Sequence, residues 1–351
     1  MTAPNHSEII EAARQRLGKR LVILAHHYMS DAVARHADHT GDSLELSRRI
    51  PDLDAEYIVF CGVFFMAETA AILAKPGQKV FIPEMNSRCV MSDMAPAWLA
   101  RDVMDILAAG GLRVTPLTYV NSSAAVKALV GERGGSVCTS ANAKVMLEWA
   151  LEQGPHTLFL PDVRLGLNSA DWVGLPKEQR HILDIREHGK AIMLEKARQA
   201  KLLLWPGQCV IHSRFKPESI RKARAESPGC KVVVHPECHP NTVALADACG
   251  STSFIIKYVA EAPEGSVIYV GTEWNLVNRL ADQYKGVKDV RPLLYSTCSN
   301  MEKVTEPNLA ALIENLDAAP RVEVDEALIP PARLALTRML EVCAGPASRH
   351  A

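Results

Sequence analysis

The sequence has no apolar stretch approaching the roughly 18 residues that a membrane-spanning helix needs. Its first residues lack a cationic segment followed by an apolar run, so no secretory signal is expected. Neither sign of charge dominates, because 39 Lys and Arg residues stand against 40 Asp and Glu residues without blocks of like charge. Nucleic acids and anionic membranes favour a basic surface, so neither is expected as the main partner. The composition predicts a cytoplasmic protein that acts on small molecules.

The cysteines lack the spacing of common metal and disulfide motifs. No C-x-x-C pair occurs among the nine cysteines, which argues against zinc ribbons, ordinary ferredoxin spacings and thioredoxin-type sites. An odd number of cysteines at irregular spacing in a chain of 351 residues is also untypical of a disulfide framework. Reduced thiols in a cytosolic setting are therefore expected.

Short apolar strands alternate with amphipathic helices over most of the chain, a pattern typical of βαβ units with buried parallel sheets. The length and the 48% apolar content suffice for two or three domains. The fold class is therefore predicted to be α/β. The expected strands fall into three sets, at residues 21–25, 57–61 and 79–83, then 112–120, 136–139 and 157–161, then 231–235, 254–258, 266–271 and 293–297.

The helices between these strands show polar starts and apolar faces. After Ser140, an expected N-cap, apolar side chains recur between residues 143 and 151 at the spacing of one helix face. Near the end of the chain, an apolar pattern after Pro330 and Pro331 predicts a final helix. We expect that helix to return toward the first unit.

Chemically active side chains follow the first strand of each set. His26 and Tyr28 end the first of these strands, Tyr119 the second, and His235 with Glu237 the third. Helix starts explain Ser, Thr and Asn at such places, but they do not call for His, Tyr or Glu. Because ligands bind at the carboxyl ends of parallel strands, three such tips facing one another would enclose one shared site. We place the three units at residues 1–110, 111–226 and 227–351.

Three cysteines differ from the other six. Cys89, Cys209 and Cys298 each follow a strand within loop-like sequence, one in each unit, whereas the others have the settings of buried or incidental thiols. If each unit presents one cysteine to a common centre, three thiolates converge there. Spacing alone leaves a structural role for each of them open.

The chain resembles the quinolinate synthase family from residue 21 to about residue 301. Any one of the matching segments could arise by chance, but so many of them in family order are not expected by chance. The segments are AHHY at 25–28, GDSL at 41–44, VFCGVFFMAET at 59–69, YVNS at 119–122, TSANA at 139–143, LPD at 160–162, CVIHSRF at 209–215, HPEC at 235–238, GSTS at 250–253, TE at 272–273 and CSNM at 298–301.

The resemblance implies three α/β/α domains with short parallel sheets around a pseudo-threefold axis. It also implies a 4Fe-4S cluster held by Cys89, Cys209 and Cys298, with one iron free of protein ligands to act as a Lewis acid. The implied reaction condenses iminoaspartate with dihydroxyacetone phosphate to quinolinate, releasing phosphate and two waters. This reaction feeds NAD biosynthesis, and it implies a functional link to an L-aspartate oxidase or dehydrogenase.

The family motifs imply roles for further residues. Glu237, with His235, is the expected general acid or base, because a carboxylate in a closed pocket can be tuned toward the working pH. Tyr28 is expected to transfer protons, and His26 and His212 to hydrogen-bond substrate carboxylates. The residues expected to bind substrate are His26, Ser43, Tyr119, Asn121, Ser140, His235, Glu237, Ser251 and Thr252, of which Ser43, Ser140, Ser251 and Thr252 stand near helix starts and suit a phosphate.

Three positions depart from the family pattern, namely His27, Phe64 and Ser299. None of them is an expected cluster ligand. Lys257 could add a positive charge to the site, but a role as an ordinary solvated side chain explains this lysine equally well.

Two other functions stay open from the residues. A non-catalytic iron-sulfur metabolite sensor could use the same three-unit clamp, although acid-base groups at every strand tip exceed what binding requires. An open-corner iron-sulfur dehydratase would share the Lewis-acid iron, but it would act on one substrate and need no phosphate donors.

Overall fold

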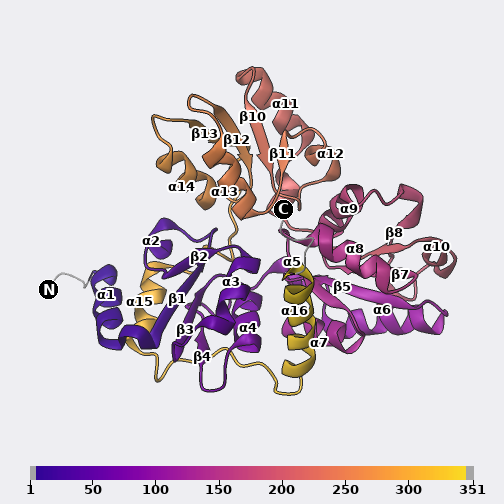
Figure 1. Cartoon of the computed structure of the whole chain (residues 1–351), viewed down its shortest axis with the longest axis horizontal. Coiled ribbons are helices and arrows are strands. Elements are labelled where there is room, and N and C mark those ends of the chain that lie inside the picture. Colours follow the sequence, from indigo (N-terminus) through magenta and orange to yellow (C-terminus); the bar gives the residue numbers. More distant parts are fainter. Residues whose placement is uncertain (1–4, 345–351) are drawn as a thin grey trace.

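The computed structural model describes residues 5–344 and contains three separate parallel sheets flanked by helices, which form three lobes around a common centre (Figure 1). The predicted α/β class with three α/β/α units is confirmed. In each sheet the first strand of the unit lies between the second and the third, so the three units repeat one topology. The unit boundaries proposed above stay a prediction.

The first sheet is the simplest of the three. Its strands are, in spatial order, β2 (His39–Gly41), β1 (Leu21–His26), β3 (Tyr57–Cys61) and β4 (Lys79–Phe81), all parallel. Every residue of β3 is buried, as expected for a strand covered on both faces of the sheet. The helices of this unit are α1 (His6–Leu17), α2 (Asp31–Ala34), α3 (Ser43–Arg49), α4 (Phe64–Leu73) and α5 (Val90–Asp93).

The second sheet has one strand more. Its order is β6 (Ser136–Cys138), β5 (Val114–Tyr119), β7 (His156–Leu160), β9 (Leu202–Leu204) and β8 (Arg180–Ile182), again all parallel. Strands β8 and β9 were not predicted from the sequence. The helices that pack around this sheet are α6 (Ala97–Ala109), α7 (Ala124–Glu132), α8 (Ala143–Gln153), α9 (Val163–Trp172) and α10 (Leu194–Gln199).

The third sheet corrects two expectations. Its order is β11 (Ala248–Cys249), β10 (Lys231–Val234), β12 (Val267–Gly271) and β13 (Asp289–Pro292), and its helices are α11 (Pro217–Glu226), α12 (Pro240–Val243), α13 (Thr252–Glu261) and α14 (Trp274–Gln283). The strand predicted at residues 254–258 is wrong, because this apolar run forms α13 and buries Ile255 and Val259 one helical turn apart. The strand predicted at 293–297 is also wrong, because the edge strand β13 ends before it and alternates buried Val290 with more exposed neighbours.

The end of the chain packs on the first two units. Helix α15 (Glu306–Glu314) lies against α1, and α16 (Ile329–Ala344), the predicted final helix, lies mainly against α7 and β6. From α16, the Arg333 Nε donates to the carbonyl of Ile72 at 2.8 Å. The C-terminal segment therefore joins the first unit to the second.

The apolar core is divided unequally. One continuous cluster fills the first unit, the second unit and the C-terminal helices, whereas the two faces of the third sheet have their own smaller clusters. The third unit therefore meets the other two mainly through contacts outside these apolar clusters. Among residues 5–344, no helix is long and apolar enough to cross a membrane.

Substitution of Gly131 by alanine should destabilise the chain by about 1–3 kcal/mol, the usual cost of overpacking. A Cβ at Gly131 in α7 would meet the carbonyl oxygen of Pro331 in α16 at 1.9 Å, and this oxygen belongs to the backbone. Thermal unfolding measures the effect. Gly154→Ala is the control, because its Cβ would meet nothing closer than 3.3 Å; equal midpoints for the two variants would contradict the prediction.

Candidate functional site

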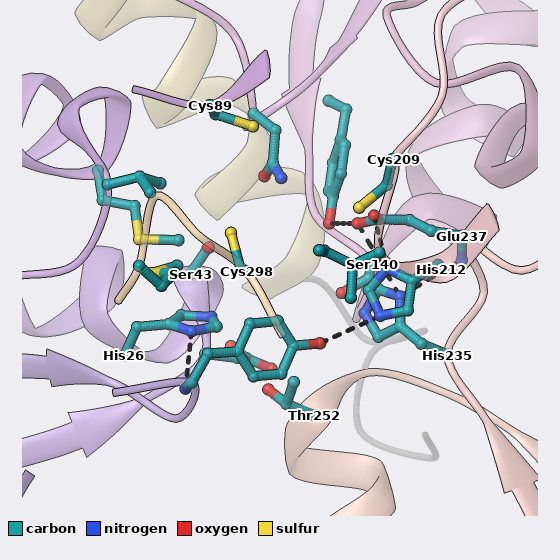
Figure 2. A pocket seen from close by; sticks show the side chains of 18 of the residues that line it. His26, Ser43, Cys89, Ser140, Cys209, His212, His235, Glu237, Thr252 and Cys298 are labelled. Atoms are coloured by element: carbon teal, nitrogen blue, oxygen red, sulfur yellow. Dashed lines mark hydrogen bonds and ion pairs between the residues drawn. The ribbon is translucent and has the colours of Figure 1, made fainter. Parts of the chain in front are cut away.

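A pocket lies where the carboxyl ends of strands from all three units meet (Figure 2). It encloses about 590 Å³, part of which is open to solvent. Its lining residues are His26, Tyr28, Asp42, Ser43, Val63, Phe65, Met66, Cys89, Tyr119, Asn121, Ser140, Cys209, Ile211, His212, His235, Glu237, Thr252, Cys298 and Met301.

All of the residues predicted to be catalytic, substrate-binding or cluster-ligating line this pocket except one. The exception is Ser251, whose hydroxyl caps α13 by accepting from the amide of Phe254 at 3.3 Å. Ser140 was expected to be an N-cap, but Asn142 occupies that position before α8 and leaves Ser140 at the pocket wall.

The three cysteine loops are placed by the same backbone contact in each unit. In each unit, one helix follows β3, β7 or β12. The first amide of that helix donates to the carbonyl two residues before the cysteine. These hydrogen bonds run from Phe64 to Ser87 at 2.7 Å, from Val163 to Gly207 at 2.9 Å and from Trp274 to Ser296 at 2.9 Å. Helices α4, α9 and α14 thereby bring Cys89, Cys209 and Cys298 to one pocket.

The three thiols occupy similar electrostatic settings. Burial raises the pKa of Cys89 to about 12 and also raises the pKa of Cys209 and Cys298. Amide N–H groups two or three residues further along each turn act in the opposite direction by hydrogen-bonding the sulfur; they belong to Met91, Ser92, His212, Asn300 and Met301. The loops are therefore arranged to stabilise thiolates once a metal displaces the protons.

A chain of hydrogen bonds crosses the pocket from the first unit to the second. The Tyr28 hydroxyl lies 2.6 Å from Thr272 Oγ1, which lies 3.1 Å from His212 Nε2. His212 Nδ1 lies 2.9 Å from Glu237 Oε2, and the Tyr119 hydroxyl donates to Glu237 Oε1 at 2.6 Å. An ionised carboxylate only accepts, so Nδ1 of His212 carries the proton of its hydrogen bond with Glu237.

Glu237 sits at the centre of this chain and is fully buried by surrounding groups. Burial by itself raises the pKa of Glu237, but the charge and hydrogen bond of His212, with His235 and Tyr119, bring it below its ordinary value. Burial raises the pKa of Tyr28 and Tyr119, so both phenols keep their protons. The pocket therefore holds one buried carboxylate surrounded by hydrogen-bond donors.

His26 and His235 are equivalent imidazoles on the first and third units. In each, Nδ1 accepts from the amide two residues later, that of Tyr28 at 3.2 Å and that of Glu237 at 3.3 Å. Burial lowers the pKa of both rings to about 3, so they are neutral, and the proton lies on Nε2. Both rings therefore offer an N–H donor to an anion in the pocket.

Two polar residues of the site were not predicted from the sequence. Asp42 lines the pocket, caps α3 through the amides of Leu44 and Glu45 at 3.0 Å, and accepts from Ser253 at 3.0 Å. Thr272 is fully buried and joins the hydrogen-bond chain, although it does not line the pocket. Asp42 lies in the family segment GDSL and Thr272 in the segment TE, and these motifs could have identified both residues.

The three departures from the family pattern lie outside the pocket lining. Phe64 begins α4 next to the lining residues, and Ser299 is exposed. His27 Nε2 lies 3.5 Å from Glu45 Oε2, and this contact lowers the pKa of Glu45 to about 2. Lys257 is a solvated side chain, 3.8 Å from Glu261 on the same helix.

One compact set of metal-binding atoms stands out in the described part of the chain. The ligand atoms of Cys209, His212 and Glu237 all lie within 4.8 Å of one another. The three cysteines do not form so tight a group. A cubane cluster spreads its thiolates over separate irons, so its ligands need not approach as closely as those of a single ion.

Comparisons with known proteins point in one direction. The model of the quinolinate synthetase A protein family matches residues 8–341. A quinolinate synthase of Acidobacterium capsulatum is 44% identical over 97% of this chain and 95% of its own length. Those of Streptomyces coelicolor and Staphylococcus carnosus are each 41% identical, over 97% and 95% of this chain and 90% and 92% of their own lengths.

The stability of the metal-free protein should rise with pH between about 3 and 6.5 because of His26 and His235. Their pKa values are lowered on folding, so the unfolded chain binds more protons in this window. Each ring contributes a slope of about 1.4 kcal/mol per pH unit. Denaturant unfolding at several pH values measures the slope. It should flatten in His26→Asn and His235→Asn, whose amide oxygen can replace Nδ1; an unchanged slope would contradict the assignment.

Proposed function

The chain belongs to the quinolinate synthase family and is an enzyme of NAD biosynthesis; we propose that its central pocket condenses iminoaspartate with dihydroxyacetone phosphate beside a three-cysteine 4Fe-4S cluster. The observation that carries this proposal is the meeting of one cysteine from each unit in one pocket with the acid-base chain of Glu237. All nine cysteines are free thiols, in keeping with the predicted cytoplasmic setting.

The donor set suits an iron-sulfur cluster better than a single ion. Cys89, Cys209 and Cys298 supply three soft thiolates, each with backbone N–H groups near its sulfur. The tighter set of Cys209, His212 and Glu237 would need His212 and Glu237 to give up their mutual bond. When bound, a cluster with three protein ligands supplies an open iron that acts as a Lewis acid on a substrate oxygen or nitrogen.

The remaining side chains match the charges of the two substrates. The Nε2–H groups of His26 and His235 can donate to the carboxylates of iminoaspartate, and the amide of Asn121 adds a further donor. The hydroxyls of Ser43, Ser140 and Thr252 line the pocket and can donate to the phosphate of dihydroxyacetone phosphate. We no longer assign Ser251 a direct contact, because its hydroxyl caps α13.

Proton transfer falls to Glu237 and its chain. An ionised carboxylate held by Tyr119 and His212 acts as the general base, and its orientation is locked by both hydrogen bonds. When Glu237 gives a proton to the substrate as a general acid, His212 can replace it from Nδ1, and Tyr28 can resupply Nε2 of His212 through Thr272. The condensation, ring closure and dehydrations all require such shuttling.

The alternatives fit the pocket less well. A metabolite sensor needs no continuous acid-base chain, and an iron-sulfur dehydratase acting on one substrate needs no hydroxyl cluster for phosphate. An anaerobic assay with the iron- and sulfide-reconstituted chain, iminoaspartate and dihydroxyacetone phosphate tests the proposal. Quinolinate should form; its absence from a fully loaded protein would refute the enzymatic assignment.

Iron analysis should separate three cysteines from the rest. After anaerobic reconstitution, the chain should hold about four iron and four sulfide per chain, as a cubane cluster requires. Cys89→Ser, Cys209→Ser and Cys298→Ser should lose most of this iron. Cys61→Ser and Cys343→Ser are the controls, because these thiols are buried away from the pocket; equal losses from all five variants would show that the ligands are assigned wrongly.

Thr272→Val should lower kcat up to about 10-fold with little change in KM, since the variant keeps the shape and leaves Tyr28 and His212 only their long direct contact of 3.4 Å. Steady-state kinetics measure both constants. The matched control is Thr157→Val in β7, whose buried hydroxyl has no hydrogen-bond partner. The relay is not used in turnover if the two variants keep equal kcat values.

A further inference from the structure

Two buried acids stand directly behind the cysteine loops. Asp162 follows β7 and is the N-cap of α9, and Glu273 follows β12 and is the N-cap of α14. Both side chains are completely buried, with 0% exposure. An isolated carboxylate in such a place is costly unless hydrogen bonds compensate for the lost water.

Backbone amides supply that compensation, and they include the amides of the cysteines. Asp162 Oδ1 accepts from the amides of Arg164 and Leu165 at 2.8 Å, and its Oδ2 accepts from the amide of Cys209 at 3.1 Å. Glu273 accepts from the amide and the side chain of Asn275 at 2.8 and 3.1 Å, and it lies close enough to the backbone amide of Cys298 for that amide to lower its pKa. Each acid thus ties the start of a helix to a cysteine.

The first unit lacks this device. Val63 occupies the N-cap position of α4 and has no side-chain cap. The loop of Cys89 is held instead by the Ser87 hydroxyl, which can donate to the carbonyls of Gly62 at 3.0 Å and Asn300 at 2.8 Å. The loop of Cys89 is therefore tied to the loop of Cys298, and through it to the second acid.

Helix capping alone does not explain the two carboxylates. Ser, Thr or Asn caps a helix as well as Asp does, and with less cost when buried. A carboxylate has a second acceptor oxygen, which a hydroxyl or an amide does not offer. In Asp162, that second oxygen is the one that accepts from the cysteine amide.

We propose that Asp162 and Glu273 are positioning residues that hold Cys209 and Cys298 in the geometry needed to bind the cluster. This inference rests on the proposed cluster site. Groups behind metal ligands fix ligand orientation, and losing one typically weakens metal binding 10- to 100-fold. A change in ligand orientation also changes the electronic environment of the irons.

The test uses the reconstituted full-length chain with Asp162→Asn and Glu273→Gln. Each amide keeps one acceptor oxygen for the helix but turns an N–H₂ group toward the cysteine amide. Both variants should release iron to an excess of a chelator about 10-fold faster than the unchanged chain. The electron paramagnetic resonance spectrum of the reduced cluster should also change in both, because the orientation of the thiolates changes.

Asp247→Asn is the matched control. Its carboxylate also accepts a strand amide, that of Val232 at 2.7 Å, but at the far end of the third sheet from the pocket. It should change neither iron release nor the spectrum. Iron release equal to that of this control would overturn the proposal, and so would faster release with an unchanged spectrum, since that pattern indicates general loosening. Neither result bears on whether quinolinate forms.

Discussion

The structure depends on one hydrogen bond that is made three times. The first amide of α4, of α9 and of α14 donates to the carbonyl two residues before the cysteine of its unit. A helix start leaves its first amides without intrahelical partners, so a loop carbonyl that accepts from one of them is held in a defined position. This contact fixes where each cysteine loop crosses its helix, and three repetitions direct three thiols to one centre (Figure 2).

The pocket owes its chemistry to the way the third unit meets the others. The first two units share one apolar core, whereas the third sheet keeps its own cores on each face. The contact with the third unit can therefore be polar, and hydrogen bonds such as Tyr28 to Thr272 and Tyr119 to Glu237 cross it. Buried polar groups at such an interface are costly unless every one of them has a hydrogen-bond partner. This requirement selects a single arrangement of the catalytic side chains.

Much of the site could be predicted from particular residues. His26, Tyr28, His235 and Glu237 stand at the ends of β1 and β10, whose apolar runs are unambiguous, and parallel strands put their carboxyl ends together. The failures have local causes. Residues 254–258 combine bulky apolar side chains that suit a strand with the spacing of a helix face, and only the packing of Ile255 and Val259 decides between them. Ser140 was assigned to a cap because Ser is a good cap, although Asn142 stands two residues nearer the helix.

The sequence by itself determined the α/β class, the threefold repetition of strand and helix, and the family, because periodicity and motif order are properties of the chain alone. Only the tertiary structure decided that Thr272 links Tyr28 to His212, and that Asp162 and Glu273 stand behind two of the cysteines. These contacts join residues far apart in the chain, and the number of residues between them carries no information about their distance in space. They arise when the three sheets meet and each buried polar group must find a partner.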